Sequence, residues 1–262
     1  MPSIKPVAAA LAAAIVVGCG DGTGPAPTLA VQFRVVPGAT AAAQLVSGPR
    51  FSVVGSADAQ QLDVIGTNGT LHITALTLLL SELELDRVEN GDCDADGEQC
   101  DEVEAGPFAV DVPLTGEPVT VASDAIEPGS YEELEFEVED FDADEGEDAS
   151  AFEQLLEEVR NQFADWPTTA SLVVEGTFTP EGGTPTSFRA YFQAEIELEM
   201  DLEPPLEITD AGETITVELH VADWFLQPDG TVADLSQYDF TTTGEVVEFE
   251  LEIENGVSVE DD

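Results

Sequence analysis

Positively charged side chains are nearly missing from this 262-residue chain, in which 6 lysines and arginines face 56 aspartates and glutamates for a formal net charge of −50. Nucleic-acid binding needs cationic side chains that neutralise phosphates, so the composition excludes nucleic acid as a partner. The same charge disfavours direct binding to an anionic lipid surface. Such charge often accompanies disorder, but 43% of the residues are hydrophobic and their regular spacing predicts a folded core.

Metal-binding and nucleophilic residue types are scarce as well. The chain has 2 histidines, 3 cysteines and 2 methionines, whereas zinc and copper sites usually combine several such ligands. No G-x-S-x-G, H-E-x-x-H or glycine-rich phosphate motif is present. We therefore expect a protein that is not an enzyme. A carboxylate-dependent hydrolase stays open as an alternative, because 56 acids make any carboxylate spacing available.

The apolar run near the N-terminus, residues 7–17, follows Lys5. It is too short to span a bilayer and suits the apolar region of a signal peptide. The run ends in Val16-Val17-Gly18-Cys19, which resembles the bacterial lipobox. This resemblance implies that residues 1–18 are a lipoprotein signal peptide and that Cys19 becomes a lipidated N-terminus.

Residues 19–28 then form the lipidated cysteine and a flexible tether rich in glycine and proline. Two or three acyl chains anchor a protein stably, whereas one chain binds only marginally. We expect an exported protein, held by its lipid at the bacterial cell membrane or outer membrane.

Two cysteines remain after Cys19, namely Cys93 and Cys100. An even number of cysteines in an exported chain predicts a disulfide. The pair lies in residues 91–102, GDCDADGEQCDE, which we expect to form the tip of a hairpin.

The same stretch places carboxylates one residue apart, as calcium loops do. Val103 stands where an EF-hand has its bidentate glutamate, so this is not an EF-hand, and solvated acidic loops are the alternative. A second acidic stretch, residues 139–148, repeats the spacing. The tentative Ca²⁺ ligands are Asp92, Asp94, Asp96, Glu98, Asp140, Asp142 and Asp144.

Strict alternation of apolar and acidic residues is the dominant pattern, as in ELEFEVE at residues 133–139. Residues 195–202 and 247–254 alternate in the same way. Such alternation is typical of antiparallel strands with one buried and one wet face. It predicts an all-β fold over residues 29–256, an antiparallel β-sandwich or a barrel-like variant, followed by an acidic tail at residues 257–262.

Two segments depart from short alternating strands. Residues 71–88 are long enough to bend or to serve two sheets. Residues 150–164 carry apolar residues at helical spacing, which predicts one amphipathic helix that covers an open end of the sandwich.

The glutamate rows raise an electrostatic question. Where two such rows are neighbours, like charges stand directly opposite and destabilise the sheet. The rows at residues 133–139, 195–202 and 247–254, and Glu82, Glu84 and Asp86, are candidates for this arrangement. Ionic strength or bound divalent ions would have to offset the repulsion.

Four segments resemble uncharacterised bacterial lipoproteins that carry a secreted β domain. They are residues 73–85, 106–114, 126–139 and 222–232. The resemblance implies a β fold and export, and it implies no reaction.

These inferences predict a membrane-anchored, acidic β-domain lipoprotein with a structural or binding role at the cell envelope and a site for Ca²⁺. A carbohydrate- or protein-binding module is an alternative, with a cell-surface protein or glycan as its partner. Such a module would show a concave aromatic patch around Trp224 and Tyr191. A hydrolase would instead show carboxylates that converge in a pocket with raised pKa values.

Overall fold

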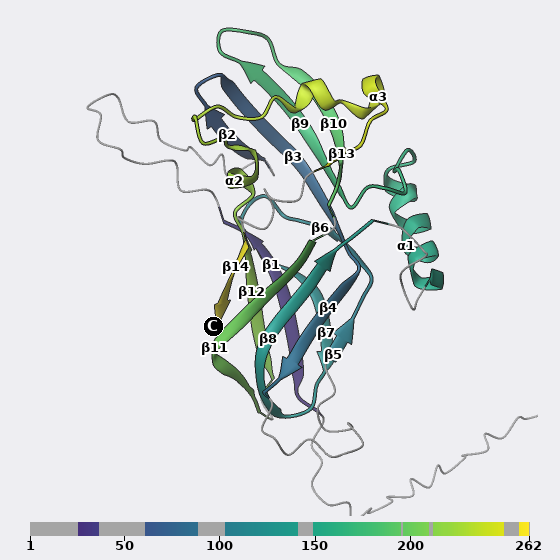
Figure 1. Ribbon diagram of the computed structural model, residues 1–262, viewed down its shortest axis with the longest axis vertical. Coiled ribbons are helices and arrows are strands. Elements are labelled where there is room, and N and C mark those ends of the chain that lie inside the picture. Colours follow the sequence, from purple (N-terminus) through teal and green to yellow (C-terminus); the bar gives the residue numbers. More distant parts are fainter. Residues whose placement is uncertain are drawn as a thin grey trace, which may run out of the picture.

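The computed structural model of the protein describes residues 26–36, 61–88, 103–140, 149–194, 196–209, 212–248 and 257–261. Strands dominate these residues, and they form three open sheets (Figure 1). The expected all-β class is confirmed, and the sandwich is the architecture observed.

Sheet A has four strands and sheet C has four, and together they form one end of the molecule (Figure 1). In spatial order, sheet A consists of β14 (Val257–Asp261), β12 (Glu213–Leu219), β1 (Thr28–Val35) and β7 (Val119–Ala125). Sheet C consists of β11 (Ile196–Ile208), β8 (Gly129–Val138), β4 (Glu82–Arg87) and β5 (Val103–Ala105).

Sheet B forms the other end of the molecule. In spatial order it consists of β13 (Val247–Glu248), β10 (Thr186–Gln193), β9 (Leu172–Pro180), β3 (Gly69–Leu80) and β2 (Leu62–Gly66), with β6 (Phe108–Asp111) paired to β3. The long segment at residues 71–88 does serve two sheets, as expected. It forms β3 in sheet B, breaks at Ser81 and continues as β4 in sheet C.

Apolar residues that alternate along the strands fill the space between the sheets. Phe33 of sheet A meets Phe136 of sheet C with ring centroids 5.3 Å apart. At the sheet B end, the short helix α2 (Val221–Phe225) inserts Trp224 and Phe225 into the same core, where Phe225 lies 6.3 Å from Phe192. The core is therefore continuous from one end of the molecule to the other.

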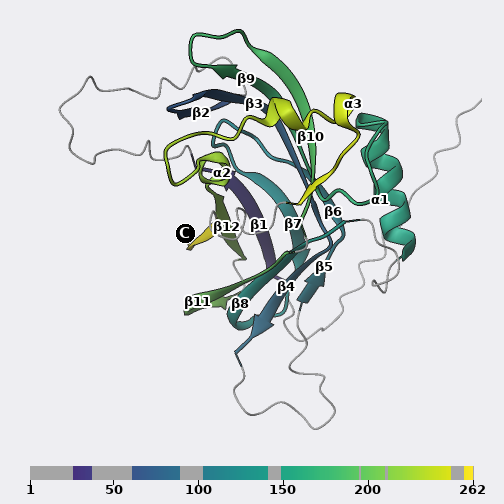
Figure 2. The same ribbon diagram turned by 45° about the horizontal axis from the view of Figure 1, so that its top comes forward.

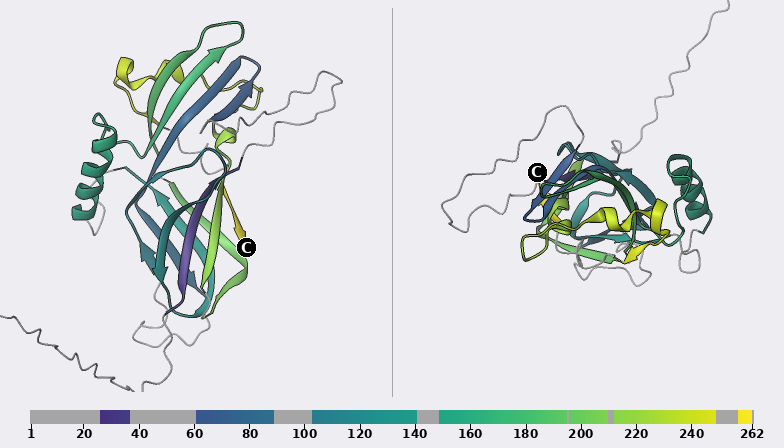
Figure 3. Two further views of the ribbon diagram at one scale, coloured as in Figure 1. Left: turned by 180° about the vertical axis from the view of Figure 1, so that it is seen from behind. Right: turned by 90° about the horizontal axis from the view of Figure 1, so that it is seen from above.

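The predicted helix is confirmed as α1 (Ala149–Gln162), but the expected position at an open end of the sandwich is wrong. The helix packs on the outer face of sheet B, and Figures 2 and 3 show it lying beside the strands. The reason is that Leu79, Val173 and Tyr191 turn apolar surface outward from β3, β9 and β10. A second apolar cluster with Trp166 buries that surface.

Three further features differ from expectation. Not every pairing is antiparallel, since β1 runs parallel to β12 and β10 parallel to β13. Val257–Asp261, expected as part of an acidic tail, instead forms β14, because its backbone pairs with the edge of β12. Two short helices, η1 (Leu235–Tyr238) and α3 (Phe240–Thr243), also lie near β10.

Candidate cation-binding face

Most of the predicted site residues lie outside the described part of the chain. These are Cys19, Cys93, Cys100, Asp92, Asp94, Asp96, Glu98, Asp142 and Asp144. Asp140 is described, and only 6% of its surface is exposed. Its Oδ2 accepts a hydrogen bond of 3.2 Å from Nε2 of Gln193 on β10. This carboxylate therefore contacts the sheet B end of the protein from its position just after β8.

The acidic rows, by contrast, come together on the outer face of sheet C. Strand β8 lies between β4 and β11, and each of its three outward glutamates stands opposite one acid on either side. We call the resulting set the carboxylate lattice. It consists of Glu82, Glu84 and Asp86 of β4, Glu133, Glu135 and Glu137 of β8, and Glu197, Glu199 and Asp201 of β11.

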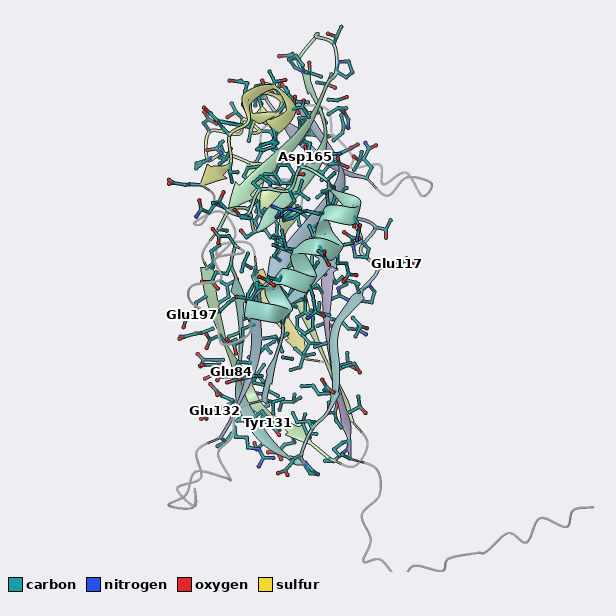
Figure 4. All side chains as sticks on the ribbon, turned by 90° about the vertical axis from the view of Figure 1, so that its right-hand side faces the viewer. Glu84, Glu117, Tyr131, Glu132, Asp165 and Glu197 are labelled. Atoms are coloured by element: carbon teal, nitrogen blue, oxygen red, sulfur yellow. The ribbon has the colours of Figure 1, made fainter. Side chains whose placement is uncertain are left out.

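The lattice follows from the register that the core imposes. In the middle row, Glu135 pairs with Glu84 on one side and with Glu199 on the other. The intervening residues, such as Leu134 and Phe136, are buried. A shift by one residue would exchange the two faces and bury the glutamates. The core thus forces like charges into opposition, and the expectation of facing acidic rows is confirmed for β4, β8 and β11. Figure 4 shows Glu84, Glu132 and Glu197 projecting from this side. In the remaining row, residues 247–248 belong to sheet B and residues 249–254 lie outside the described part of the chain.

Crowding of negative charge changes the acidity of the middle strand. The pKa of Glu135 rises from 4.5 to about 7, first because burial penalises the charged form. The charge of Glu197 and a side-chain hydrogen bond with it raise this pKa further, as do the charges of Glu137 and Glu199. The pKa of Glu133 also rises, through burial and then through the charge of Glu199. The lattice therefore holds its full negative charge at a free-energy cost.

Two groups of lattice oxygens lie close enough to share one cation. Oxygens of Glu133, Glu135 and Glu199 lie within 4.8 Å of one another, and so do oxygens of Glu135, Glu137 and Glu197. Calcium binds six to eight oxygens at about 2.3–2.6 Å, so ligands of one ion can be separated by about twice that distance. Three carboxylates, each binding through one or two oxygens, supply three to six of these oxygens, and water can supply the rest.

A hollow lies at one end of the lattice. Glu132 is an extra residue of β8 relative to β4, because Asp86 pairs with Glu133 and the next residue of β4 pairs with Tyr131. On the other side, residues 202–205 of β11 lie opposite this single residue. The hollow has a volume of about 360 Å³ and is lined by Asp86, Glu132, Glu133, Asp201, Leu202 and Glu203. Its walls are mainly carboxylates, so it suits a hydrated cation better than an apolar ligand.

The aromatic residues considered for a ligand platform are buried. Trp224 is 1% exposed and Tyr191 is 0% exposed. The Tyr191 hydroxyl donates to Oδ1 of Asp165 at 3.1 Å, beneath the cluster that holds α1. These residues therefore form no exposed aromatic patch.

The two histidines contact neighbouring strands. Nδ1 of His72 lies 2.7 Å from Oδ1 of Asp63 on β2, and Nε2 of His220 lies 3.3 Å from Oγ of Ser258 on β14. Each contact ties a strand at the edge of its sheet to the strand beside it.

Comparisons with protein-family models, with curated proteins and with solved structures return no match. In the described part of the chain, no helix combines the length and the apolar character needed to cross a membrane. The functional argument therefore rests on the site itself.

None of the nine lattice residues was among the metal ligands predicted from the sequence. That prediction favoured loops, where carboxylates one residue apart resemble calcium-binding loops. The signal that does point to the lattice is the set of acidic rows, once the order of the strands is known. Two residues apart along a strand and directly opposite across strands, these acids form a two-dimensional array.

Proposed function

We propose that this protein is an exported, lipid-anchored β-domain protein with a structural or binding role at the bacterial cell envelope, and that its carboxylate lattice binds divalent cations such as Ca²⁺. The single observation that carries the cation-binding proposal is the register of β8, which places Glu133, Glu135 and Glu137 each between two further acids. Its attachment to the membrane is through Cys19 and the tether of residues 19–28.

Cation binding would relieve the repulsion that the register creates. Like charges directly opposite in a sheet destabilise it, and at an effective dielectric near 20 two unit charges about 5 Å apart repel by roughly 3 kcal/mol before screening. An ion shared by Glu133, Glu135 and Glu199 would replace this repulsion with attraction. Divalent ions act more strongly than monovalent salt, because one ion contacts several carboxylates at once.

The nature of the macromolecular partner is a further part of the proposal. A cell-surface protein or a glycan would suit a structural or binding role at the envelope, and the negative charge disfavours nucleic acid. Trp224 and Tyr191 are buried, so they cannot form the exposed aromatic platform expected of a glycan-binding module.

One observation favours a second candidate, a carboxylate-dependent hydrolase. Glu133 has a raised pKa and lines the hollow beside Asp86 and Asp201. A glycosidase uses two neighbouring carboxyl groups, and the one that acts as the general acid has a raised pKa. Hydrolysis of a panel of aryl glycosides that is lost in Glu133→Gln, with the fold intact, would favour this candidate over a binding role.

The anchor is tested with Cys19→Ser. We expect the variant to be released from membranes or to remain as unprocessed precursor, because no thiol is available for acylation. A variant that matures and fractionates with membranes like the wild-type protein would exclude lipid anchoring.

Cation binding is tested by calorimetric titration of the purified domain with Ca²⁺ and Mg²⁺. We expect saturable Ca²⁺ binding that is lost in the double variant Glu135→Gln/Glu199→Gln. Glu157→Gln/Glu158→Gln on the exposed surface of α1 is the matched control, since it also removes two carboxylate charges, but away from the lattice. Equal Ca²⁺ binding in the wild-type protein and the double variant would place the ion elsewhere.

A further inference from the structure

The two ends of the molecule differ in their distance from the start of the chain. We call the end where β1 begins the proximal pole. There, the Ile126 backbone N–H donates to the Pro27 carbonyl at 2.9 Å, and Arg87 lies 3.4 Å from Glu127. Thr28 pairs with Ala125 in the first row of β1 and β7. The end of β4, the turn before β8 and the first residues of β1 thus meet at one pole.

The opposite end is formed by two hairpin turns of sheet B, and we call it the distal pole. Gly69 pairs there with Pro180, and the Glu181 N–H donates to the Asn68 carbonyl at 3.0 Å. The chain from Gly69 to Arg87, formed by β3, Ser81 and β4, runs from this pole to the proximal pole (Figures 1 and 3). At about 3.3 Å per residue this path spans up to about 60 Å.

The length of the tether limits where the anchor can lie. Between Cys19 and Thr28 the chain advances by nine residues, which reach at most about 30 Å when fully extended. An acyl group on Cys19 therefore stays near the proximal pole, and the distal pole lies up to about twice as far away.

Negative charge disfavours two of the ways in which the molecule could lie on its side. The outer face of sheet C carries the carboxylate lattice, and the exposed side of α1 carries Glu153, Glu157 and Glu158. Either flank would bring these carboxylates within about a Debye length, roughly 10 Å at 0.1 M salt, of anionic headgroups. An upright orientation keeps most of both flanks farther away.

We propose that the anchored protein stands on its proximal pole and presents the distal pole of sheet B away from the bilayer. This inference rests on the lipid anchor of the proposed function. The outward end then carries Ile65 on β2, which is 51% exposed and is one of two large exposed hydrophobic side chains among the described residues. A protein partner at the cell surface would meet this end first.

The test uses full-length lipidated protein reconstituted into vesicles of phosphatidylcholine with a minority of phosphatidylglycerol. A donor fluorophore is attached to Asp124→Cys at the proximal pole or to Glu181→Cys at the distal pole, in a background with Cys93→Ser and Cys100→Ser. Asp124 and Glu181, which carry the fluorophore after substitution, are both exposed acids. Energy transfer is measured to an acceptor dye on the lipid headgroups, with detergent-solubilised protein as the blank.

We expect transfer efficiency from residue 124 to be at least about twofold higher than from residue 181, given the reach of the tether and the length of the strands. Similar transfer from both positions, or more from residue 181, in protein that floats with the vesicles would overturn the orientation while the anchor stands. Protein that does not float with the vesicles would overturn the anchor and the orientation together.

Discussion

The outer faces of sheets B and C both come from strands in which inward and outward residues alternate, but the face of sheet B is covered and the face of sheet C is exposed. On sheet B, outward apolar residues such as Val173 and Tyr191 lie beneath α1 and Trp166. Acids on that face have a cationic partner, since Arg189 binds Glu175 at 2.6 Å and Asp165 at 3.1 Å. On sheet C, the register sets each outward acid of β8 against further acids.

Alternation alone does not determine whether the outer face of a sheet is covered or exposed. The inward residues set the register on both sheets. The outward residues then decide whether the face gains a covering helix or stays wet and charged. The face of sheet B contributes stability by burial, and the face of sheet C loses stability through repulsion between its carboxylates.

The largest effect is expected from removing the cover of sheet B. Trp166→Ala deletes a side chain that is 1% exposed, contacts Phe163 and Tyr191, and donates through Nε1 to the Ala170 carbonyl at 2.9 Å. We expect a loss of about 3–5 kcal/mol in the free energy of unfolding, measured by urea denaturation. A loss below about 1 kcal/mol would show that the face of sheet B does not depend on its cover.

Monovalent salt should act on the other face with a smaller effect. Raising NaCl from 0.05 M to 1 M shortens the Debye length to about 3 Å and screens the lattice. We expect a gain on the order of 2 kcal/mol, summed over pairs that each cost up to about 1 kcal/mol. Because non-specific salting effects act on all variants alike, the gain should shrink in Glu135→Gln/Glu199→Gln and persist in Glu157→Gln/Glu158→Gln. An equal gain in all three proteins would show that salt stabilises the protein through charges outside the lattice.

A still smaller effect is expected from pH at a single lattice residue. The pKa of Glu135 is about 7 in the folded protein against 4.5 ordinarily, so folding takes up a proton between these values. Stability should therefore fall as pH rises from 4.5 to 7, and the cost should be complete above pH 7.

Glu135→Gln removes this cost. We expect the variant to gain about 1 kcal/mol at pH 8, after discounting the pKa shift for solvent screening, and to gain nothing near pH 4.5. The measurement is urea denaturation of both proteins across this pH range. A gain that is independent of pH would point to packing and would contradict a titrating lattice.

Much of the fold could be predicted because it depends on local patterns. Alternation identified the strands that became β8 and β11, helical spacing identified α1, and the length of residues 71–88 indicated a segment shared by two sheets. Each of these features depends on neighbouring residues in the chain.

The candidate site could be predicted only in part, because it depends on the order of strands in space. The acids of β8 meet those of β4, far before them in the chain, and those of β11, far after them. Alternation reports which residues share a face, but it does not report which strand lies beside which. The position of α1 could not be predicted for the same reason, because the residues that it covers, Leu79, Val173 and Tyr191, come from three strands.

Binding of divalent cations by the carboxylate lattice is tested most directly by melting temperatures. These are measured with and without millimolar CaCl₂ at the same ionic strength. We predict a higher melting temperature with Ca²⁺, equivalent to about 0.4 kcal/mol when the Ca²⁺ concentration equals Kd and rising with concentration. Glu157→Gln/Glu158→Gln should retain this increment and Glu135→Gln/Glu199→Gln should lose it. An increment that is missing from the wild-type protein, or that survives in the double variant, would contradict the account.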